Sequence, residues 1–113
     1  MFNPSIHYGI LGMARSGIAA AYKIRELGGK AFLSDKLNRA MIPAAEDLES
    51  DFECEFGGHT DRLMDCPVWI VSPGIPLNVP IIQKGRAAGI RMISEIEFGF
   101  QIKHPDSKTI AVS

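Results

Sequence analysis

Short apolar runs alternate with segments of helical periodicity along most of this chain. The apolar runs predict strands at 7–11, 31–35, 52–56, 68–71 and 90–94. The segments between them predict helices at 16–27, 43–49, 60–65, 79–88 and 95–101. Because strands joined through helices by short connections cross over in the right-handed sense, the pattern predicts a mostly parallel sheet. The expected fold class is α/β, a Rossmann-like three-layer domain with a five-stranded sheet and helices on both faces.

The first predicted helix carries its small and apolar residues on one face. That face consists of Gly17, Ala20, Ala21, Ile24 and Leu27. Their spacing follows the 3.6-residue period of a helix, and the small residues favour close packing on the sheet. Gly28-Gly29 follows as a stop signal, and Thr60 is expected to cap the short helix at 60–65.

The turn between the first strand and this helix has the features of a nucleotide phosphate cradle. Its sequence is Gly12-Met13-Ala14-Arg15-Ser16-Gly17, and we assign the phosphate turn to Gly12, Ala14 and Gly17. Small residues let the backbone turn sharply, and the first N–H groups of the helix, which lack partners within it, face an incoming anion. Ala14 stands where a dinucleotide fingerprint has its second glycine, which argues against nicotinamide or flavin. A NAD-binding Rossmann domain of an oxidoreductase or regulator is the alternative interpretation.

Two further clusters follow predicted strands. Asp35-Lys36 ends the second strand, and Ser72-Pro73-Gly74 follows the fourth. Ligands of parallel sheets bind beyond the carboxyl ends of the strands, so we expect one crevice to collect both clusters and the glycine turn. An ionised Asp35 suits a ribose hydroxyl or a base N–H, with a capping or surface acid as the alternative. The Ser-Pro-Gly turn suits a phosphate or hydroxyl, with a plain loop as the alternative.

Composition excludes several classes of protein. The 113 residues contain 12 Lys and Arg against 13 Asp and Glu, without a long block of either sign. This balance argues against a nucleic-acid partner and against a polybasic membrane anchor. No apolar run approaches the roughly 18 to 20 residues that span a bilayer, and no signal-peptide pattern is present, so the cytoplasm is the expected compartment. Cys54 and Cys66 are expected to be reduced and buried, with no metal site.

Five segments of the chain stand in an informative order. They are Gly12–Gly17, the strand-end Asp35, Val71-Ser72-Pro73-Gly74-Ile75-Pro76, Ala88-Gly89-Ile90 and Ser94-Glu95-Ile96-Glu97-Phe98. Together they resemble the N-terminal domain of the Mur ligases over nearly the whole chain, and the Ser-Pro-Gly-Ile-Pro turn is the most specific part. The resemblance implies that the chain binds the UDP part of UDP-N-acetylmuramoyl-L-alanine. In the parent enzyme, D-glutamate would then be added to this substrate in an ATP-dependent step of peptidoglycan synthesis.

The resemblance implies a uridine-nucleotide site rather than a dinucleotide site. The backbone at Arg15 and Ser16 matches positions that meet the uracil and the diphosphate. Asp35 matches an acid that contacts the uracil ring. Lys36 stands beside it, where a basic or hydroxyl residue can help to hold the nucleotide.

One position departs from the family's pattern. The family often has an arginine two places after the acid, and here Leu37 stands there, so that Lys36 or Arg39 could supply the missing charge. Ser72-Pro73-Gly74 matches the turn that borders the diphosphate and the sugar. Two phosphates need donors and a positive field, whereas uracil needs a shaped edge with few polar partners, and these residue types agree with both needs.

The end of the chain implies a division into domains. Thr109-Ile110-Ala111-Val112-Ser113 resembles the strand that leads into the phosphate loop of the family's central domain. We expect a UDP-binding domain at 1–108, and at 109–113 the first strand of a central ATP-binding domain that the chain lacks. No Gly-x-x-x-x-Gly-Lys-Ser/Thr sequence is present to bind ATP. ATP, Mg²⁺ and the amino acid are therefore expected to bind the remaining ligase domains, and the fragment alone is expected to have no cofactor, no catalytic residue and no activity.

Other candidate residues have simpler interpretations. Gly57-Gly58-His59 is expected to form a turn with an exposed imidazole. Glu95 and Glu97 fall on different sides of a predicted helix, which argues against a paired-carboxylate mechanism and favours a minor substrate-side or structural role.

Overall fold

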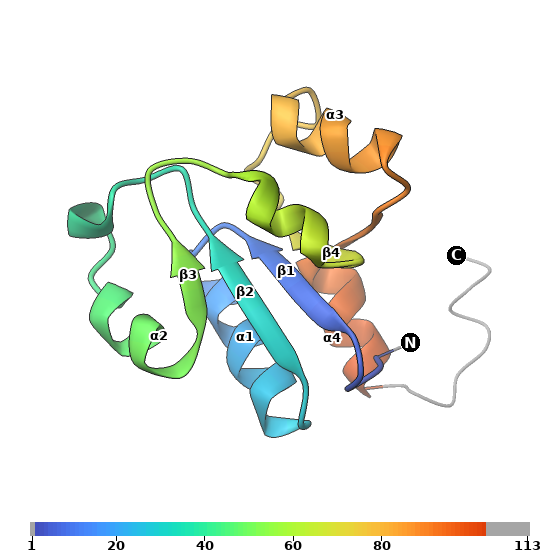
Figure 1. Ribbon diagram of the computed structural model, residues 1–113. Helices are drawn as coiled ribbons and strands as arrows, with labels where there is room; N and C mark the ends of the chain where they lie inside the picture. The colour runs from blue at the N-terminus through green and yellow to red at the C-terminus, as the bar shows by residue number, and fades with distance from the viewer. Residues whose placement is uncertain (1, 104–113) are drawn as a thin grey trace.

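A five-stranded parallel sheet lies at the centre of the structure, a computed structural model that describes residues 2–103 (Figure 1). Its strands are β1 (His7–Leu11), β2 (Lys30–Ser34), β3 (Glu53–Glu55), β4 (Val68–Val71) and β5 (Arg91–Ser94). They pair in the order β3-β2-β1-β4-β5, and every pairing is parallel. The predicted parallel α/β sheet is confirmed, and each strand agrees with its expected range to within about one residue at each end.

Helical segments connect the strands. They are α1 (Arg15–Glu26), α2 (Ala45–Asp51), α3 (Pro80–Ala87) and α4 (Glu95–Lys103), with 3₁₀ turns η1 (Arg39–Met41) and η2 (Asp61–Asp65). The helix expected at 43–49 begins later, at Ala45, because the acidic Glu46 and Asp47 then occupy its first turn, where the helix dipole favours negative charge. Thr60 caps η2 as predicted, since its side chain accepts a hydrogen bond from the Arg62 N–H. The strand expected at 109–113 lies outside the described residues.

Side chains on the two faces of the sheet form two separate cores. Tyr8, Ile10 and Leu33 face one core with α1, α2 and α4, whereas Leu11 and Trp69 face the other with η2 and α3. Strands buried on both faces explain why the sequence shows continuous apolar runs instead of alternation. Figure 1 shows α1 and α4 side by side behind the strands and the η2 turn in front of them. The predicted three-layer arrangement is therefore confirmed.

The first helix ends as its sequence predicts but buries one residue fewer. Gly17, Ala20, Ala21 and Ile24 are buried on the sheet, as expected. Leu27 was expected on the same face, but it is 39% exposed because the helix ends at Glu26 and Leu27 is already the cap residue. Gly28 then adopts a positive φ of 85°, and the next N–H, that of Gly29, donates to the Ile24 carbonyl at 2.9 Å. This is a Schellman motif, which only a residue tolerant of positive φ completes without strain.

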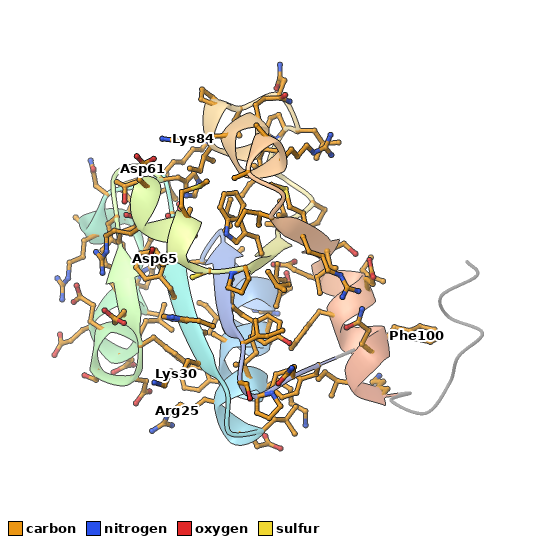
Figure 2. The ribbon with its side chains drawn as sticks, turned by 45° about the vertical axis from the view of Figure 1, so that its right-hand side comes forward. Arg25, Lys30, Asp61, Asp65, Lys84 and Phe100 are labelled. Atoms are coloured by element: carbon orange, nitrogen blue, oxygen red, sulfur yellow. The ribbon has the colours of Figure 1, made fainter. Side chains whose placement is uncertain are left out.

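Trp69 organises the core between the sheet, η2 and α3. The indole is fully buried, and its Nε1–H donates to the Leu63 carbonyl at 2.9 Å. Glycine makes room for the ring on both sides, because a Cβ at Gly9 would lie 2.9 Å from the indole and one at Gly85 would lie 2.5 Å from it. An ion pair between Lys84 of α3 and Asp61 of η2 spans the outside of this core (Figure 2). Both partners are exposed, so the pair adds little to the buried packing.

The fit between Trp69 and α3 predicts opposite outcomes for two glycine-to-alanine substitutions. Gly85→Ala places a methyl group against the indole, whereas Gly99→Ala in α4 meets no heavy atom within 4 Å. Both variants gain helix propensity, so Gly99→Ala is expected to raise the free energy of unfolding by about 0.5–1 kcal/mol. Gly85→Ala is expected to lie about 1–3 kcal/mol below Gly99→Ala, because the buried ring cannot move freely. Urea unfolding followed by circular dichroism measures both values, and equal stabilities would contradict this account of the core.

Candidate functional site

Three turns meet at the carboxyl edge of the sheet, where the strand order reverses between β1 and β4. Gly12 follows β1, and its N–H donates to the Ser34 carbonyl at the end of β2 at 2.8 Å. Ser72 follows β4, and its N–H donates to the Leu11 carbonyl of β1 at 3.2 Å. Gly12 has a φ of 105°, and a Cβ there would lie 3.0 Å from the Cβ of Ser72. A side chain at position 12 would therefore crowd Ser72, and glycine permits the close approach of the ends of β1 and β4.

A cavity of about 470 Å³ opens at this edge, within the size range of small-molecule sites. Six of the predicted site residues line it, namely Gly12, Ala14, Asp35, Lys36, Ser72 and Gly74. The remaining four, Arg15, Ser16, Gly17 and Pro73, are not among its lining residues. The structure therefore brings together the three clusters that the sequence analysis singled out, and it places the cavity on the side of the glycine turn that faces β2 and β4.

The lining has two chemically different parts. Asp35, Lys36 and His59 form a charged and polar corner beyond β2 and β3. An apolar wall lies opposite, beyond β4 and at the start of α3; its residues are Ile75, Pro76, Val79, Pro80 and Ile81. Leu37 adds a further apolar side chain, 43% exposed. A ligand with one polar and one flat apolar part matches this division.

Asp35 joins two of the converging turns through its carboxylate. One oxygen, Oδ2, accepts the Met13 N–H of the glycine turn at 2.6 Å, and the other, Oδ1, accepts the Leu37 N–H at 2.9 Å. The residue is only 9% exposed. These bonds show that Asp35 shapes the site by capping backbone donors. Each carboxylate oxygen can accept a second hydrogen bond, so a contact with a ligand is compatible with this role.

The glycine turn is packed tightly against the first turn of α1. A Cβ at Gly17 would lie 2.3 Å from the Gly12 carbonyl oxygen, so no other residue fits there without movement of the backbone. Ala14 is the extended N-cap residue of α1, and Arg15 and Ser16 are exposed. This compact turn leaves the first N–H groups of α1 beside the cavity rather than within its lining.

Glu95, the first residue of α4, approaches the same helix end. The Ser16 hydroxyl donates to Glu95 Oε1, and Glu95 Oε2 is buried without a hydrogen-bond partner among the described residues. A Cβ at Gly17 would lie 3.2 Å from this Oε2 atom. A carboxylate in this position is favourable to the helix dipole and opposes a second anion at the same place. A minor substrate-side or structural role was expected for this acid, and its contact with Ser16, which sequence spacing did not reveal, is a structural one.

His59 is part of a buried polar network that the sequence analysis missed. The Gly57-Gly58 turn exists, with positive φ at both glycines, but the imidazole expected to be exposed is half-buried. Its Nδ1 lies 2.6 Å from the Ser34 hydroxyl oxygen, and that hydroxyl lies 2.6 Å from Glu55 Oε2. Thr60 donates to the same carboxylate through both its N–H, at 2.9 Å, and its hydroxyl. The network links β2, β3 and the loop that carries His59.

The charge on Glu55 fixes the direction of these hydrogen bonds. Burial alone would raise the pKa of Glu55, but hydrogen bonds from Ser34 and Thr60 and the charge of Arg62 outweigh burial and lower it. An ionised Glu55 only accepts, so the Ser34 hydroxyl donates to it and must itself accept from the Nδ1–H of His59. The neutral ring therefore carries its proton on Nδ1, and its Nε2 is an acceptor. Burial lowers the pKa of His59, which favours this neutral form.

Comparison with known proteins identifies the family. The sequence matches the model of the Mur ligase MurD-like N-terminal domain over residues 7–94. The chain belongs to this family. It is 41% identical over 88 residues to the UDP-N-acetylmuramoylalanine--D-glutamate ligase of Salinibacter ruber, covering 78% of this chain and 19% of that protein. The ligase of the same name from Elusimicrobium minutum is 36% identical over 104 residues, covering 92% of this chain and 22% of that protein.

The MurD-like domain spans about a fifth of the length of these curated relatives. A solved structure, that of shikimate dehydrogenase from Aquifex aeolicus, superimposes with a TM-score of 0.51 at 15% identity. The superposition covers 96% of this chain and 52% of the dehydrogenase. At this level of identity the likeness shows the Rossmann-like fold alone.

Several other residues that the sequence singled out do not contribute to the cavity. Arg39, a candidate for the missing family arginine, does not line the cavity, and its Nε lies 2.7 Å from Glu49 Oε1. Both cysteines are free; Cys66 is buried as expected, but Cys54 is only half-buried. Burial raises the pKa of Cys54 to about 11 and that of Cys66 to about 12, so neither is a thiolate at neutral pH. Within residues 2–103, no group of three or more side chains could hold a metal ion, and no helix could span a bilayer.

The Glu55 network predicts a pH-dependent contribution to stability. A carboxylate with a lowered pKa stabilises the fold above its unfolded-state pKa, and this contribution is lost as the pH falls through the folded value. Glu55→Gln is expected to reduce the free energy of unfolding by about 1–3 kcal/mol near neutral pH, and by less at about pH 3. Glu53→Gln, at an exposed position on the same strand, is the control and is expected to change stability by less than about 0.5 kcal/mol. Denaturant unfolding at both pH values measures the effect. If Glu55→Gln loses the same unfolding free energy at both pH values, Glu55 is not ionised in the folded protein.

Proposed function

We propose that this domain binds the UDP part of UDP-N-acetylmuramoyl-L-alanine in the cavity at the carboxyl edge of the sheet. The parent protein would be an ATP-dependent ligase that adds D-glutamate in peptidoglycan synthesis. Membership of the MurD-like N-terminal family, together with relatives named as UDP-N-acetylmuramoylalanine--D-glutamate ligases, carries the proposal. The cavity at the switch point of the sheet supports it independently, because open parallel sheets bind nucleotides there.

The lining of the cavity suits the two parts of UDP. The Asp35 carboxylate offers an acceptor to the uracil N–H, and the apolar Leu37 beside it offers a surface for the flat face of the pyrimidine. Lys36 supplies positive charge, and the Ser72 hydroxyl and the Gly74 backbone supply hydrogen-bonding groups near the diphosphate. No heavy atom lies within 4 Å of a Cβ built on Gly74, so the space beside that glycine is open to a ligand.

The surroundings of the α1 N-terminus favour UDP over NAD. A dinucleotide pyrophosphate binds at the start of this helix, and it needs the second glycine of the fingerprint for close approach. Here Ala14 stands at that position, and the carboxylate of Glu95 lies against the same turn of α1. A diphosphate held by Lys36 and the Ser72–Gly74 turn avoids both obstacles. Arg15 and Ser16 would then meet the nucleotide through their backbone only.

In this proposal the domain holds the substrate and the rest of the ligase performs the chemistry. To form the amide, such a ligase would use ATP and Mg²⁺ to activate the substrate carboxylate as an acyl phosphate. The amine of the incoming amino acid would then attack the activated carbonyl and displace phosphate. We assign these steps to the remaining ligase domains in the cytoplasm and assign no catalytic residue to this chain, so the chain alone would be inactive. Binding the nucleotide end places the reactive carboxylate for those domains, which is how binding energy remote from the reaction centre contributes to catalysis.

Titration with nucleotides tests the proposed ligand class. UDP and UDP-N-acetylmuramoyl-L-alanine are expected to shift the backbone amide resonances of Arg15, Ser16, Asp35 and Gly74, because Asp35 and Gly74 line the cavity and Arg15 and Ser16 follow the lining residue Ala14 in the chain. NADH and ATP are expected to cause no saturable shifts there. Two-dimensional NMR of the labelled chain measures both. Saturable shifts with NADH but not with the uridine compounds would replace the proposal by a dinucleotide-binding function.

A substitution at Gly74 separates binding from folding. Gly74 has no positive φ and open space around its Cβ position, so Gly74→Val is expected to fold with wild-type stability. The added side chain fills the side of the cavity proposed for the diphosphate and is expected to weaken UDP binding at least about tenfold, or about 1.4 kcal/mol. Gly99→Ala is the control, because it adds a methyl group at a residue that does not line the cavity. Calorimetric titration gives the affinities, and unchanged binding by Gly74→Val would place the ligand elsewhere.

A further inference from the structure

The nucleotide part of the proposed substrate leaves the apolar wall of the cavity uncovered. Uracil is assigned to the corner of Asp35 and Leu37. The diphosphate is assigned to Lys36 and the Ser72–Gly74 turn. Neither assignment uses the apolar wall, which consists of Ile75, Pro76, Val79, Pro80 and Ile81. A different part of the ligand must therefore account for this surface.

The apolar wall is held in place and offers no side chain that forms hydrogen bonds. The Ile75 N–H donates to the Ser72 carbonyl at 3.1 Å, which fixes the turn that begins the wall. Pro76 and Pro80 have rigid rings and no N–H. A ligand hydroxyl against this surface would lose its hydrogen bonds to water without replacement, whereas a methyl group is stabilised by leaving water. The wall therefore selects an apolar group.

Ile75 brings the wall next to the proposed diphosphate position. A Cβ built on Gly12 would lie 3.8 Å from Ile75 Cδ1, so this side chain reaches the glycine turn. Along the sheet edge the strands follow in the order β2, β1 and β4, with neighbours about 4.8 Å apart. A nucleotide with its base at Asp35, beyond β2, and its diphosphate at the Ser72–Gly74 turn, beyond β4, carries the group on its terminal phosphate toward the wall.

The sugar of the proposed substrate has an apolar group close to its phosphates. Carbon 1 of the pyranose is bonded to the diphosphate, and the neighbouring carbon 2 bears an acetamido group that ends in a methyl. The lactyl group, on carbon 3, is one carbon farther away and leads to the carboxylate that the remaining ligase domains must reach. The acetamido methyl is therefore the group that suits the wall.

We propose that the apolar wall is a subsite for the acetamido methyl group of the sugar, and that it makes this domain selective for nucleotides of N-acetylated sugars. This inference rests on the proposed uridine-nucleotide function and adds to it a means of recognising the sugar. No heavy atom lies within 4 Å of a Cβ built on Gly74, so the space between the diphosphate position and the wall is open on that side.

UDP-N-acetylglucosamine and UDP-glucose test this inference, because they differ only in the acetamido group or hydroxyl on carbon 2. Calorimetric titration of the 113-residue chain with each nucleotide gives the two affinities. UDP-N-acetylglucosamine is expected to bind about five to ten times more tightly, since one methyl group leaves water and no hydroxyl loses its hydrogen bonds. Equal affinities, or tighter binding of UDP-glucose, would overturn the inference.

Matched variants at Ile75 show whether the wall causes the preference. Ile75→Val and Ile75→Thr have the same shape, but only threonine places a hydroxyl on the wall. The ratio of the two affinities is expected to fall close to unity in Ile75→Thr and to stay clearly higher in Ile75→Val. Leu77→Thr is the control, because Leu77 is 59% exposed in the same loop and does not line the cavity. Equal ratios in the two Ile75 variants would place the acetamido group elsewhere.

The outcomes separate this inference from the proposed function. Ile75 also packs against the core around Trp69, so unfolding curves accompany each titration. If Ile75→Thr does not fold, Pro76→Ser, at an exposed position of the wall, takes its place and is expected to lower the ratio in the same way. Binding of both nucleotides with equal affinity would overturn the acetamido subsite alone. Failure of every uridine compound to bind would overturn the proposed function, and the subsite with it.

Discussion

The buried carboxylate of Asp35 sets the shape of the whole ligand edge. It accepts one N–H from Met13 in the glycine turn after β1 and one from Leu37 in its own loop after β2, so the two loops cannot move apart without leaving the buried Met13 N–H unpaired. Unpaired buried donors are costly, and the two loops are therefore held in one arrangement. The cavity beside them is lined by the same loops. A residue that looks like a ligand contact in the sequence is in the structure first a support for the walls of the cavity.

Local features of the sequence predicted the fold well. Apolar runs located every strand of the sheet, and Gly28-Gly29 located the end of the first helix, because these signals depend on neighbours within a few residues. The convergence of the three turns also followed from the sequence, since parallel strands present their carboxyl ends at one edge. The prediction that Leu27 lies on the packed face of the first helix was wrong for an equally local reason, because the helix ends one residue before it.

The chemistry around the site was less accessible to sequence analysis. Ser34 and His59 are 25 residues apart, and Ser16 and Glu95 are 79 apart. No spacing rule connects such pairs, because their contact is decided by how whole elements pack. His59 was therefore expected to be exposed, and Glu95 was not connected to the glycine turn. The same limit applies to Arg39, whose pairing with Glu49 depends on how the η1 turn faces α2.

The position of Ile81 has a consequence for how this family can vary. Its side chain belongs to the core around Trp69, and the residue also lines the cavity. Sequence change at α3 must therefore satisfy two requirements at once, the fit around the indole and the shape of the ligand wall. Pro76, which lines the cavity before the helix begins and is exposed, meets only the second requirement. Adaptation of the pocket to a different ligand is consequently freer in the loop than in the helix that follows it.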